Sequence, residues 1–397
     1  MKKYIILTLI TLLILSCEKK KESILVFDSE PAEKFIEIID YIEKSSNQKL
    51  LFKKFSDQVI TANYKKNSSD KYLNTKINNL LKLQAYSKLS ESTIAYSDSS
   101  KIKAKDAYRF AFLNLPFYRT RMNGDMVSAW INYWENNYNL KASKFLNDLN
   151  ENSEIIKNKA IRLSNKYYPS NIVKIDTIAT IFCMDGNRSS FTSDNTIYME
   201  LVYSTDFNIE RFTKILSHEL HHINYSNWLL NKIKITSEKQ EGIFKLQRKI
   251  ILEGIAQQIN FIDYNQQAKK LYENRELISE LNINFINNLI SINKSKTPLN
   301  AFQESISNMW KISDSLLEKY CKEDYEEHTV SHRPTFLYYI SYQLYNVIEK
   351  NGKDEEIRYV IEHPESLLEV YNSLRNENNI IPKYPDEIVQ LWKTNFK

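Results

Sequence analysis

The sequence predicts an α+β fold that is predominantly helical and contains one small β-sheet. Glycine and proline are scarce, with 5 and 8 among 397 residues, and the lack of these helix breakers favours long helices. Apolar residues recur at helical spacing over most of the chain, whereas two short segments between residues 171 and 208 have the composition of strands. A chain of this length can bury a large core and is typical of two or three domains.

The amino terminus predicts a targeting segment that lies outside the fold. Two lysines precede an apolar run from Tyr4 to Leu15, which is too short to remain as a membrane-spanning helix. A small residue and Cys17 follow this run directly, which resembles the signal of bacterial lipoproteins. The resemblance implies that residues 1–16 are removed, that Cys17 is lipidated, and that residues 17–30 form a tether. The alternative is an ordinary signal peptide with an incidental cysteine.

This amino terminus predicts a location in the bacterial cell envelope, with Cys17 attaching the protein to a membrane. The formal net charge of +5 is spread along the chain without a basic tail or basic helix face, which argues against a nucleic-acid partner. Export would permit a disulfide between Cys183 and Cys321, although two separate buried thiols fit the sequence equally well.

Residues 31–170 are predicted to form an amino-terminal helical region. Pro31 opens a run of apolar residues at helical spacing, and similar stripes follow further along the chain. We expect these stripes to face a core and to carry no chemistry. They include Phe35, Ile36, Ile38, Ile39 and Ile42 in the first, and Ile155, Ile156, Ala160, Ile161 and Leu163 in the last.

Residues 171–397 are predicted to form a second unit that combines strands with helices. Ile175–Met184 is rich in β-branched residues, and Thr196–Tyr203 alternates along its length, so both are expected to be strands. Asp206 or Asn208 can cap the helix that follows, from Asn208 to Asn231. Further helices are expected over Ile250–Phe261, Leu299–Tyr320 and Thr335–Ile348.

The segment from His218 to His222 has the pattern His-Glu-x-x-His within the expected helix. The chain has six histidines, and three of them fall within these five residues. His218 and His222 lie one helical turn apart on the same face, so both imidazoles can bind one Zn²⁺. The glutamate between them, Glu219, is then close enough to activate a water molecule as a general base.

A catalytic zinc commonly has three protein ligands and one open position, so a third ligand is required. The best candidate is Glu253, because a carboxylate within an apolar run is costly to bury unless it is paired or binds a metal. The small residues Gly254 and Ala256 beside it permit the close approach of a neighbouring helix. Glu253 as a surface residue is the alternative, and Glu238 and Glu241 compete from a polar stretch that resembles a loop.

Two strands, a His-Glu-x-x-His helix and a later helix with a glutamate resemble the gluzincin, thermolysin-like metallopeptidases. The Glu-Gly-Ile-Ala sequence around Glu253 also resembles zinc-dependent peptidases predicted among bacterial lipoproteins. The likeness covers roughly residues 171–350. It implies a thermolysin-like core with extra helices, a peptide or protein substrate, one zinc held by His218, His222 and Glu253, and Glu219 as the base.

The chain departs from this pattern in two places. Thirty residues separate His222 from Glu253, so we expect an inserted segment within Asn224–Lys249. Gln257 stands where related enzymes often have an aspartate that orients a histidine, and its amide oxygen could accept a histidine N–H instead. His221 offers an alternative chelate with His218, but we expect it to form a hydrogen bond beside the site or to pack on the helix flank.

The implied reaction is hydrolysis by a zinc-activated water, which also needs a donor to the developing oxyanion. The segment His332–Tyr342 resembles a Tyr-Tyr-x-Gly-Tyr element of the related peptidases, with Ser341 at the glycine position. Tyr339, His332 and Arg333 are the candidate donors, although core packing is the alternative for any tyrosine here.

The strand Thr196–Tyr203 is either an edge that binds the substrate backbone or an inner strand of the sheet. Two other functions remain open: a catalytically inactive lipoprotein of the same fold that binds a partner in envelope assembly, and a zinc hydrolase of a non-peptide amide.

Overall fold

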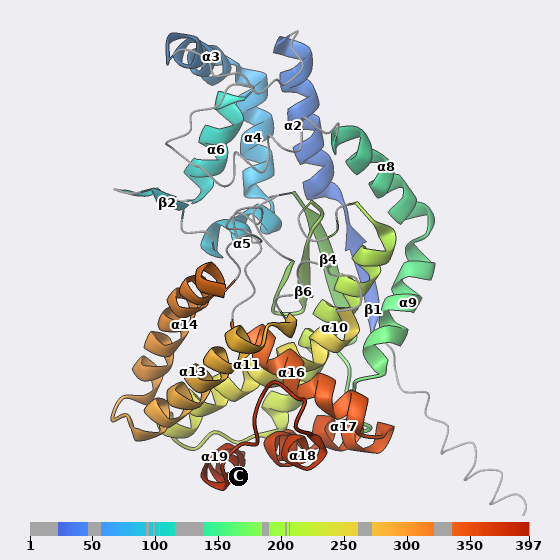
Figure 1. Cartoon of the computed structure of the whole chain (residues 1–397). Helices are drawn as coiled ribbons and strands as arrows, with labels where there is room; N and C mark the ends of the chain where they lie inside the picture. Colours follow the sequence, from blue (N-terminus) through green and yellow to red (C-terminus); the bar gives the residue numbers. More distant parts are fainter. Residues whose placement is uncertain are drawn as a thin grey trace, which may run out of the picture.

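The computed structural model has the predicted fold class, a mostly helical α+β architecture with a small sheet. A hydrogen-bonded sheet crosses the middle of the molecule, and helices surround it and extend to either end (Figure 1). The structure describes residues 23–46, 57–92, 95–97, 100–102, 104–115, 138–184, 190–202, 205, 207–260, 272–320 and 336–396.

The sheet has four strands in the order β1-β4-β6-β5. The first three strands in this order run parallel, and β5 is antiparallel to β6. Both segments predicted to be strands belong to this sheet, as β4 and β6. The strands are β1 (Ile24–Asp28), β4 (Thr177–Cys183), β6 (Thr196–Glu200) and β5 (Phe191–Ser193), while β2 (Ala95–Ser97) and β3 (Ser100–Ile102) form a separate antiparallel pair.

The strand β1 corrects the prediction that residues 17–30 form only a tether. Residues 24–28 pair in parallel with β4, with Val26 opposite Ala179. Their partner strand lies almost 150 residues later in the sequence, so no local pattern could reveal the pairing. Periodicity over five residues also cannot separate a short strand from a linker.

The strand β6 is an inner strand, so of the two alternatives for this segment the substrate-binding edge is wrong. Residues 196–198 pair with β5 on one side and with β4 on the other. Beyond β5, the hydroxyl of Ser190 accepts a hydrogen bond from the backbone N–H of Glu200 at 3.1 Å. Both faces of β6 are also covered, since Ile197 and Tyr198 are equally buried. Its main-chain groups along these residues are therefore already paired.

Helices account for most of the remaining described chain, and their bounds agree closely with the predicted helices over residues 208–231, 299–320 and 335–348. Between β1 and β4 in the sequence lie α2 (Glu30–Ser46), α3 (Asp57–Ser69), α4 (Lys71–Lys82), α5 (Gln84–Ser92), α6 (Ala104–Asn114), α8 (Tyr138–Glu151) and α9 (Ser153–Asn165). After them lie α10 (Ile209–Lys232), α11 (Glu238–Asn260), α13 (Arg275–Lys294), α14 (Pro298–Tyr320), α16 (Phe336–Asn351), α17 (Asp354–Glu362), the 3₁₀ turn η2 (Pro364–Ser366), α18 (Leu367–Leu374) and α19 (Asp386–Thr394).

The apolar stripe predicted on α2 is buried throughout, which confirms its role in the core. The stripe on α9 is only partly correct, because Ile156 and Ala160 are buried whereas Ile155 is 69% exposed. Adjacent residues of a helix point about 100° apart, so the spacing fits Ile156 with Ala160 and turns Ile155 away from the core.

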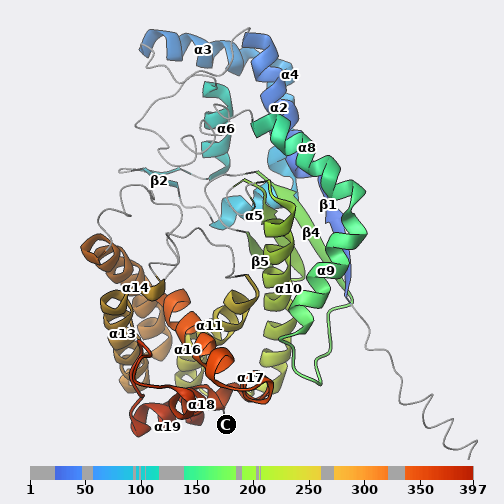
Figure 2. The same ribbon diagram turned by 45° about the vertical axis from the view of Figure 1, so that its right-hand side comes forward.

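The buried apolar residues form two clusters that meet along α10. The first contains the sheet, the amino-terminal helices and the start of α10 as far as Ile223. The second begins on α10 at Tyr225 and Leu229 and extends through α11 to α19. Figure 2 shows α13, α14 and α16 to α19 gathered at the opposite end of the molecule from α2, α3 and α6. The division of the chain at residue 170 stays a prediction.

The sheet is fastened to α10 by aromatic contacts on one face. Phe182 of β4 lies 5.2 Å from the ring of Phe27 on β1 and 5.5 Å from the ring of Phe212 on α10. At the carboxyl end of β4, the hydroxyl of Tyr86 on α5 donates to the carbonyl oxygen of Met184 at 3.0 Å. These contacts fix the first half of α10 against a rigid layer.

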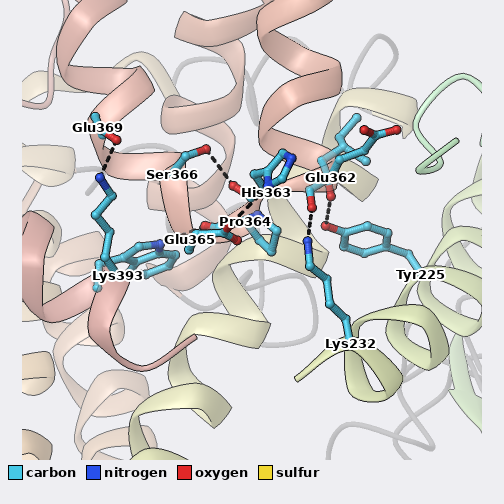
Figure 3. Close-up of polar contacts among 11 residues, drawn as sticks. Tyr225, Lys232, Glu362, His363, Pro364, Glu365, Ser366, Glu369 and Lys393 are labelled. Atoms are coloured by element: carbon cyan, nitrogen blue, oxygen red, sulfur yellow. Dashed lines mark hydrogen bonds and ion pairs between the residues drawn. The ribbon is translucent and has the colours of Figure 1, made fainter. Parts of the chain in front are cut away.

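The other end of α10 is held by the carboxyl end of α17. Tyr225 donates to the carbonyl oxygen of Ile361 at 2.7 Å, and Lys232 donates to the carbonyl oxygen of Glu362. Figure 3 shows both side chains reaching from α10 to the end of α17. In the following turn η2, the carbonyl oxygen of Pro364 accepts a hydrogen bond from Trp392 of α19 at 2.9 Å. Because both ends are anchored, α10 is a stable support for side chains at its middle.

None of the helices in the described ranges combines the length and apolar character that are needed to cross a bilayer.

The thiol of Cys183 is buried and lies 3.6 Å from the carbonyl oxygen of Met199. Cys321 and Cys17 lie outside the described residues, so their disulfide and lipidation predictions stay untested.

Candidate metal centre

The helix α10 carries the His-Glu-x-x-His segment, as predicted. It begins after Asn208, whose side-chain oxygen accepts a hydrogen bond from the N–H of Arg211 at 2.9 Å and so selects Asn208 as the cap. The segment His218–His222 lies in the middle of α10, where the two hydrophobic clusters meet. Both ligand candidates therefore lie at the middle of a 24-residue helix that is anchored at both ends.

The helix α11 supplies Glu253, and the prediction of an inserted segment before it is wrong. The helix α10 continues to Lys232 and α11 begins at Glu238, so residues 233–237 alone connect them. The thirty residues between His222 and Glu253 are therefore made up of the end of α10, this short connection and the start of α11. Glu238 and Glu241 lie in the first turn of α11 and not in a loop. At 1.5 Å per residue they start about 18–22 Å from Glu253 along the helix axis, so they cannot join the site.

Three contacts show how α10 and α11 are matched. From the start of α10, His218 meets Ala256, His222 meets Glu253, and Ser226 accepts a hydrogen bond from Arg248. As the residue number rises on α10, it falls on α11, which is the regular register of an antiparallel helix pair.

The side chains of His218, His222 and Glu253 converge, and they are the group of potential metal ligands found among the described residues. The Nε2 atoms of the two histidines lie 2.9 Å apart. Oε2 of Glu253 lies 3.5 Å from Nε2 of His222 and 3.9 Å from Nε2 of His218. Tetrahedral bonds of about 2.1 Å would place ligand atoms about 3.4 Å apart, so the three atoms fit a zinc ion without large movement.

The carboxylate of Glu253 also lacks another partner that would explain its burial. Its Oε2 atom is buried, and its polar neighbours are the two histidines, of which His222 is the nearer at 3.5 Å. A buried acceptor without a donor is costly, and a buried carboxylate is more costly still unless a cation balances it. The burial of Glu253 is therefore consistent with a metal ligand and not with the surface glutamate considered as the alternative.

The backbone of α11 fixes the orientation of His218. Its Nδ1 atom lies 3.0 Å from the carbonyl oxygen of Ala256. A carbonyl can only accept, so Nδ1 carries the proton and the lone pair of Nε2 faces Glu253. The expectation that Gln257 orients a histidine is wrong, because the carbonyl of the preceding residue occupies this role. Sequence inspection missed Ala256 because a backbone acceptor leaves no signal in the residue type.

Burial and neighbouring charges shift the pKa values of the two histidines in opposite directions. Burial, together with neighbouring His222, lowers the pKa of His218 to about 3, so that this ring is neutral at pH 7 and able to bind a metal. Burial also acts to lower the pKa of His222, but the carboxylate of Glu253 outweighs it and raises this pKa. Burial alone would raise the pKa of Glu253, and the proximity of His222 lowers it instead. Glu253 is thus a carboxylate at neutral pH.

Glu219 is buried beside these ligands with a pKa suited to proton transfer. Burial raises its pKa to about 7, the charge of Glu253 adds to the rise, and the charge of His222 opposes it. No hydrogen bond to its carboxylate is present within the described part of the chain. A buried carboxyl group with a pKa near 7 can both take and return a proton at neutral pH.

His221 points away from the ligand group, as expected. Its Nε2 atom lies 3.3 Å from the carbonyl oxygen of Tyr167, and its ring stacks between Tyr168 and Tyr225 at 5.4 and 5.1 Å. The alternative chelate of His218 with His221 finds no support, because His221 is absent from the converging group.

The helix α16 packs against α11 next to Glu253. A methyl group at Gly254 would lie 2.5 Å from Cε2 of Tyr345 and 3.0 Å from the carbonyl oxygen of Ser341. The ring of Tyr345 is fully buried and leaves room only for glycine at this contact. The small residue beside Glu253 was a usable signal for this close approach, but the sequence did not identify the partner helix.

Tyr339, a predicted oxyanion donor, is not one of the three side chains that converge. Tyr339 lies on α16, is fully buried, and packs its ring 4.5 Å from that of Tyr272. His332 and Arg333 lie outside the described residues.

A search of protein-family models matches residues 77–379 to the family described as "Putative zinc dependent peptidase (DUF5700)". No curated protein matches the chain, and no solved structure does. The match spans about three quarters of the chain and includes all three converging side chains. On this evidence, the chain belongs to the DUF5700 family, whose description is that of a putative zinc-dependent peptidase.

Proposed function

We propose that this protein is a gluzincin-type metallopeptidase of the cell envelope that hydrolyses peptide bonds with one zinc ion. His218, His222 and Glu253 would hold the ion. The observation that carries the proposal is the convergence of two imidazole nitrogens and one carboxylate oxygen within 2.9–3.9 Å. Three ligands leave an open position, which is typical of catalytic and not of structural zinc.

When bound, zinc would act as a Lewis acid on the substrate carbonyl and would lower the pKa of a coordinated water. Glu219 is the general base in this proposal. Its carboxylate takes a proton at the start of hydrolysis and returns it to the leaving amine, for which the buried environment and the pKa of about 7 are suitable.

Tyr339 and His332 remain the proposed donors to the oxyanion. For Tyr339 the support is its place on α16, the helix that packs directly against α11 and Glu253.

We also propose that Cys17 is lipidated and anchors the protein to a membrane after export. The support is the sequence alone: a charged start, a short apolar run and a cysteine directly after it.

The test of metal binding uses His222→Ala with His363→Ala as the matched control. His363 lies between α17 and η2 and contacts Glu365 at 3.1 Å, away from the ligand group. Purified protein should contain close to one zinc per chain, His222→Ala should lose most of it, and His363→Ala should retain it. Equal zinc content in all three proteins would contradict the proposed ligands.

The test of catalysis uses Glu219→Gln with Glu210→Gln as the control on the same helix, where Glu210 is exposed and pairs with Lys214. Cleavage of a peptide library, followed by mass spectrometry, should disappear in Glu219→Gln although zinc remains bound. Zinc binding without cleavage by the unmodified protein would favour the inactive binding module. Cleavage of acyl-amide substrates alone would favour a non-peptide hydrolase.

A further inference from the structure

Gln257 lies on the same face of α11 as Glu253, one helical turn further along the chain. Side chains on a helix lean toward its amino terminus, so the amide of Gln257 leans back toward the carboxylate of Glu253. The side chain is only 3% exposed. Its Oε1 atom is buried and accepts no hydrogen bond from any described residue.

An amide oxygen in this position requires an explanation. Folding removes its hydration, and a buried acceptor without a donor is among the rarer features of folded proteins. The histidine that it was expected to serve is already satisfied, because Nδ1 of His218 donates to Ala256. The chain thus places an unused acceptor about 5–6 Å, one helical turn, from a metal-ligand candidate.

We propose that Gln257 is a substrate-positioning residue whose side-chain oxygen accepts a backbone N–H from the bound peptide. The inference rests on the proposed function, since it takes the substrate to be a peptide. A peptide that places a carbonyl group at the open position beside Glu253 presents an N–H on each neighbouring residue, spaced about 3.4 Å apart along an extended chain. Such a donor would satisfy Oε1 only in the complex, so that binding energy is linked to correct placement of the substrate.

A buried water molecule is the competing donor, and the two donors predict different stabilities. Methionine has a shape similar to that of glutamine. If Oε1 is unpaired without substrate, replacing Gln257 by methionine removes a buried polar group without breaking a hydrogen bond to Oε1. The zinc-free Gln257→Met protein should then be at least as resistant to urea as the unmodified protein. A lower urea midpoint would show that Oε1 is already satisfied in the folded protein and would overturn the proposal.

The decisive experiment removes the donor instead of the acceptor. A peptide cleaved in the library test is synthesised as a series in which one backbone N–H at a time is replaced by an ester oxygen. Binding to zinc-loaded protein is measured in the Glu219→Gln background, where no cleavage occurs. One ester position should weaken binding about three- to tenfold when Gln257 is present and have no such effect in Gln257→Met.

Gln258→Met is the matched control. This neighbouring amide already donates to Gly254 and Tyr342 at 3.5 and 3.4 Å, so its loss should leave the ester-dependent weakening unchanged. If the ester series affects Gln257→Met and the unmodified background equally, the role of Gln257 is refuted while the metallopeptidase proposal stands. If the unmodified protein neither binds zinc nor cleaves any peptide, the proposed function fails and the role of Gln257 fails with it.

Discussion

The contact between Gly254 and α16 allows a sharp test of how Glu253 is positioned. In Gly254→Ala, the new methyl group would lie 2.5 Å from Cε2 of Tyr345 and closer still to Cδ2, whereas carbon atoms in contact prefer about 3.5 Å. The two helices must then separate by about 1 Å or more. The ring cannot turn aside easily, because Tyr345 is fully buried.

The energetic balance is unfavourable for Gly254→Ala. Alanine stabilises a helix by about 1 kcal/mol relative to glycine, whereas an extra methyl group in a tightly packed core destabilises the fold by about 1–3 kcal/mol. We expect a net loss of up to about 2 kcal/mol in the free energy of unfolding. A displacement of about 1 Å also moves Glu253 from the histidines, and we expect zinc affinity to fall about tenfold or more. Urea unfolding and competition with a zinc chelator measure the two effects.

Gly242→Ala is the control on the same helix. Its methyl group would meet the carbonyl oxygen of Pro298 at 2.8 Å, so stability should fall here too. The site lies eleven residues before Glu253, about 16 Å along the axis, and zinc affinity should stay unchanged. Unaltered zinc affinity in Gly254→Ala, or an equal loss in Gly242→Ala, would refute the idea that the contact with Tyr345 positions Glu253.

Three further predictions concern pH, a buried hydrogen bond and the metal. Burial lowers the pKa of His221 well below 6.5, so the unfolded chain takes up a proton that the folded, zinc-free chain excludes. Stability should therefore fall as the pH drops below 6.5, and urea unfolding of His221→Phe should lack that part of the loss, whereas parallel pH profiles would contradict it. Tyr225→Phe leaves the buried carbonyl oxygen of Ile361 without its donor and should cost about 1–3 kcal/mol, measured as a lower urea midpoint; an unchanged midpoint would show that water replaces the hydroxyl. Free zinc at one hundred times its dissociation constant should stabilise the protein by about 2.7 kcal/mol in thermal unfolding, and the same increase in His222→Ala would place the metal elsewhere.

Much of the helical architecture could be predicted because its signals are local. Asn208, the apolar stripe of α10 and the absence of breakers predicted that helix to within one residue of each end. The spacing of His218 and His222 then placed both rings on one face, whatever surrounds the helix. The third ligand candidate, Glu253, could be predicted for a related reason, because a lone carboxylate within an apolar run indicates a buried position.

Other features depend on partners that are distant in the sequence. The strand β1 is recognisable only through its pairing with β4, and β6 became an inner strand only because the three-residue β5 covers it. Whether α10 and α11 are joined by an inserted segment or by longer helices could not be read from the thirty residues between His222 and Glu253. The first four residues of α11 are polar and resemble a loop in sequence, yet this end of the helix packs against the start of α14 beside Gly242, and Gln247 donates to the carbonyl oxygen of Trp392 on α19.

By itself, the sequence determined which residue types can bind a metal, and the helical spacing that brings two of them together. Only the tertiary structure decided that Glu253 comes within 3.5 Å of His222, that a backbone carbonyl and not Gln257 orients His218, and that His221 faces an aromatic stack. The physical reason is the range of the interactions. Helix formation and face selection depend on neighbours within four residues, whereas ligand convergence depends on how two anchored helices pack, which is set by the whole core.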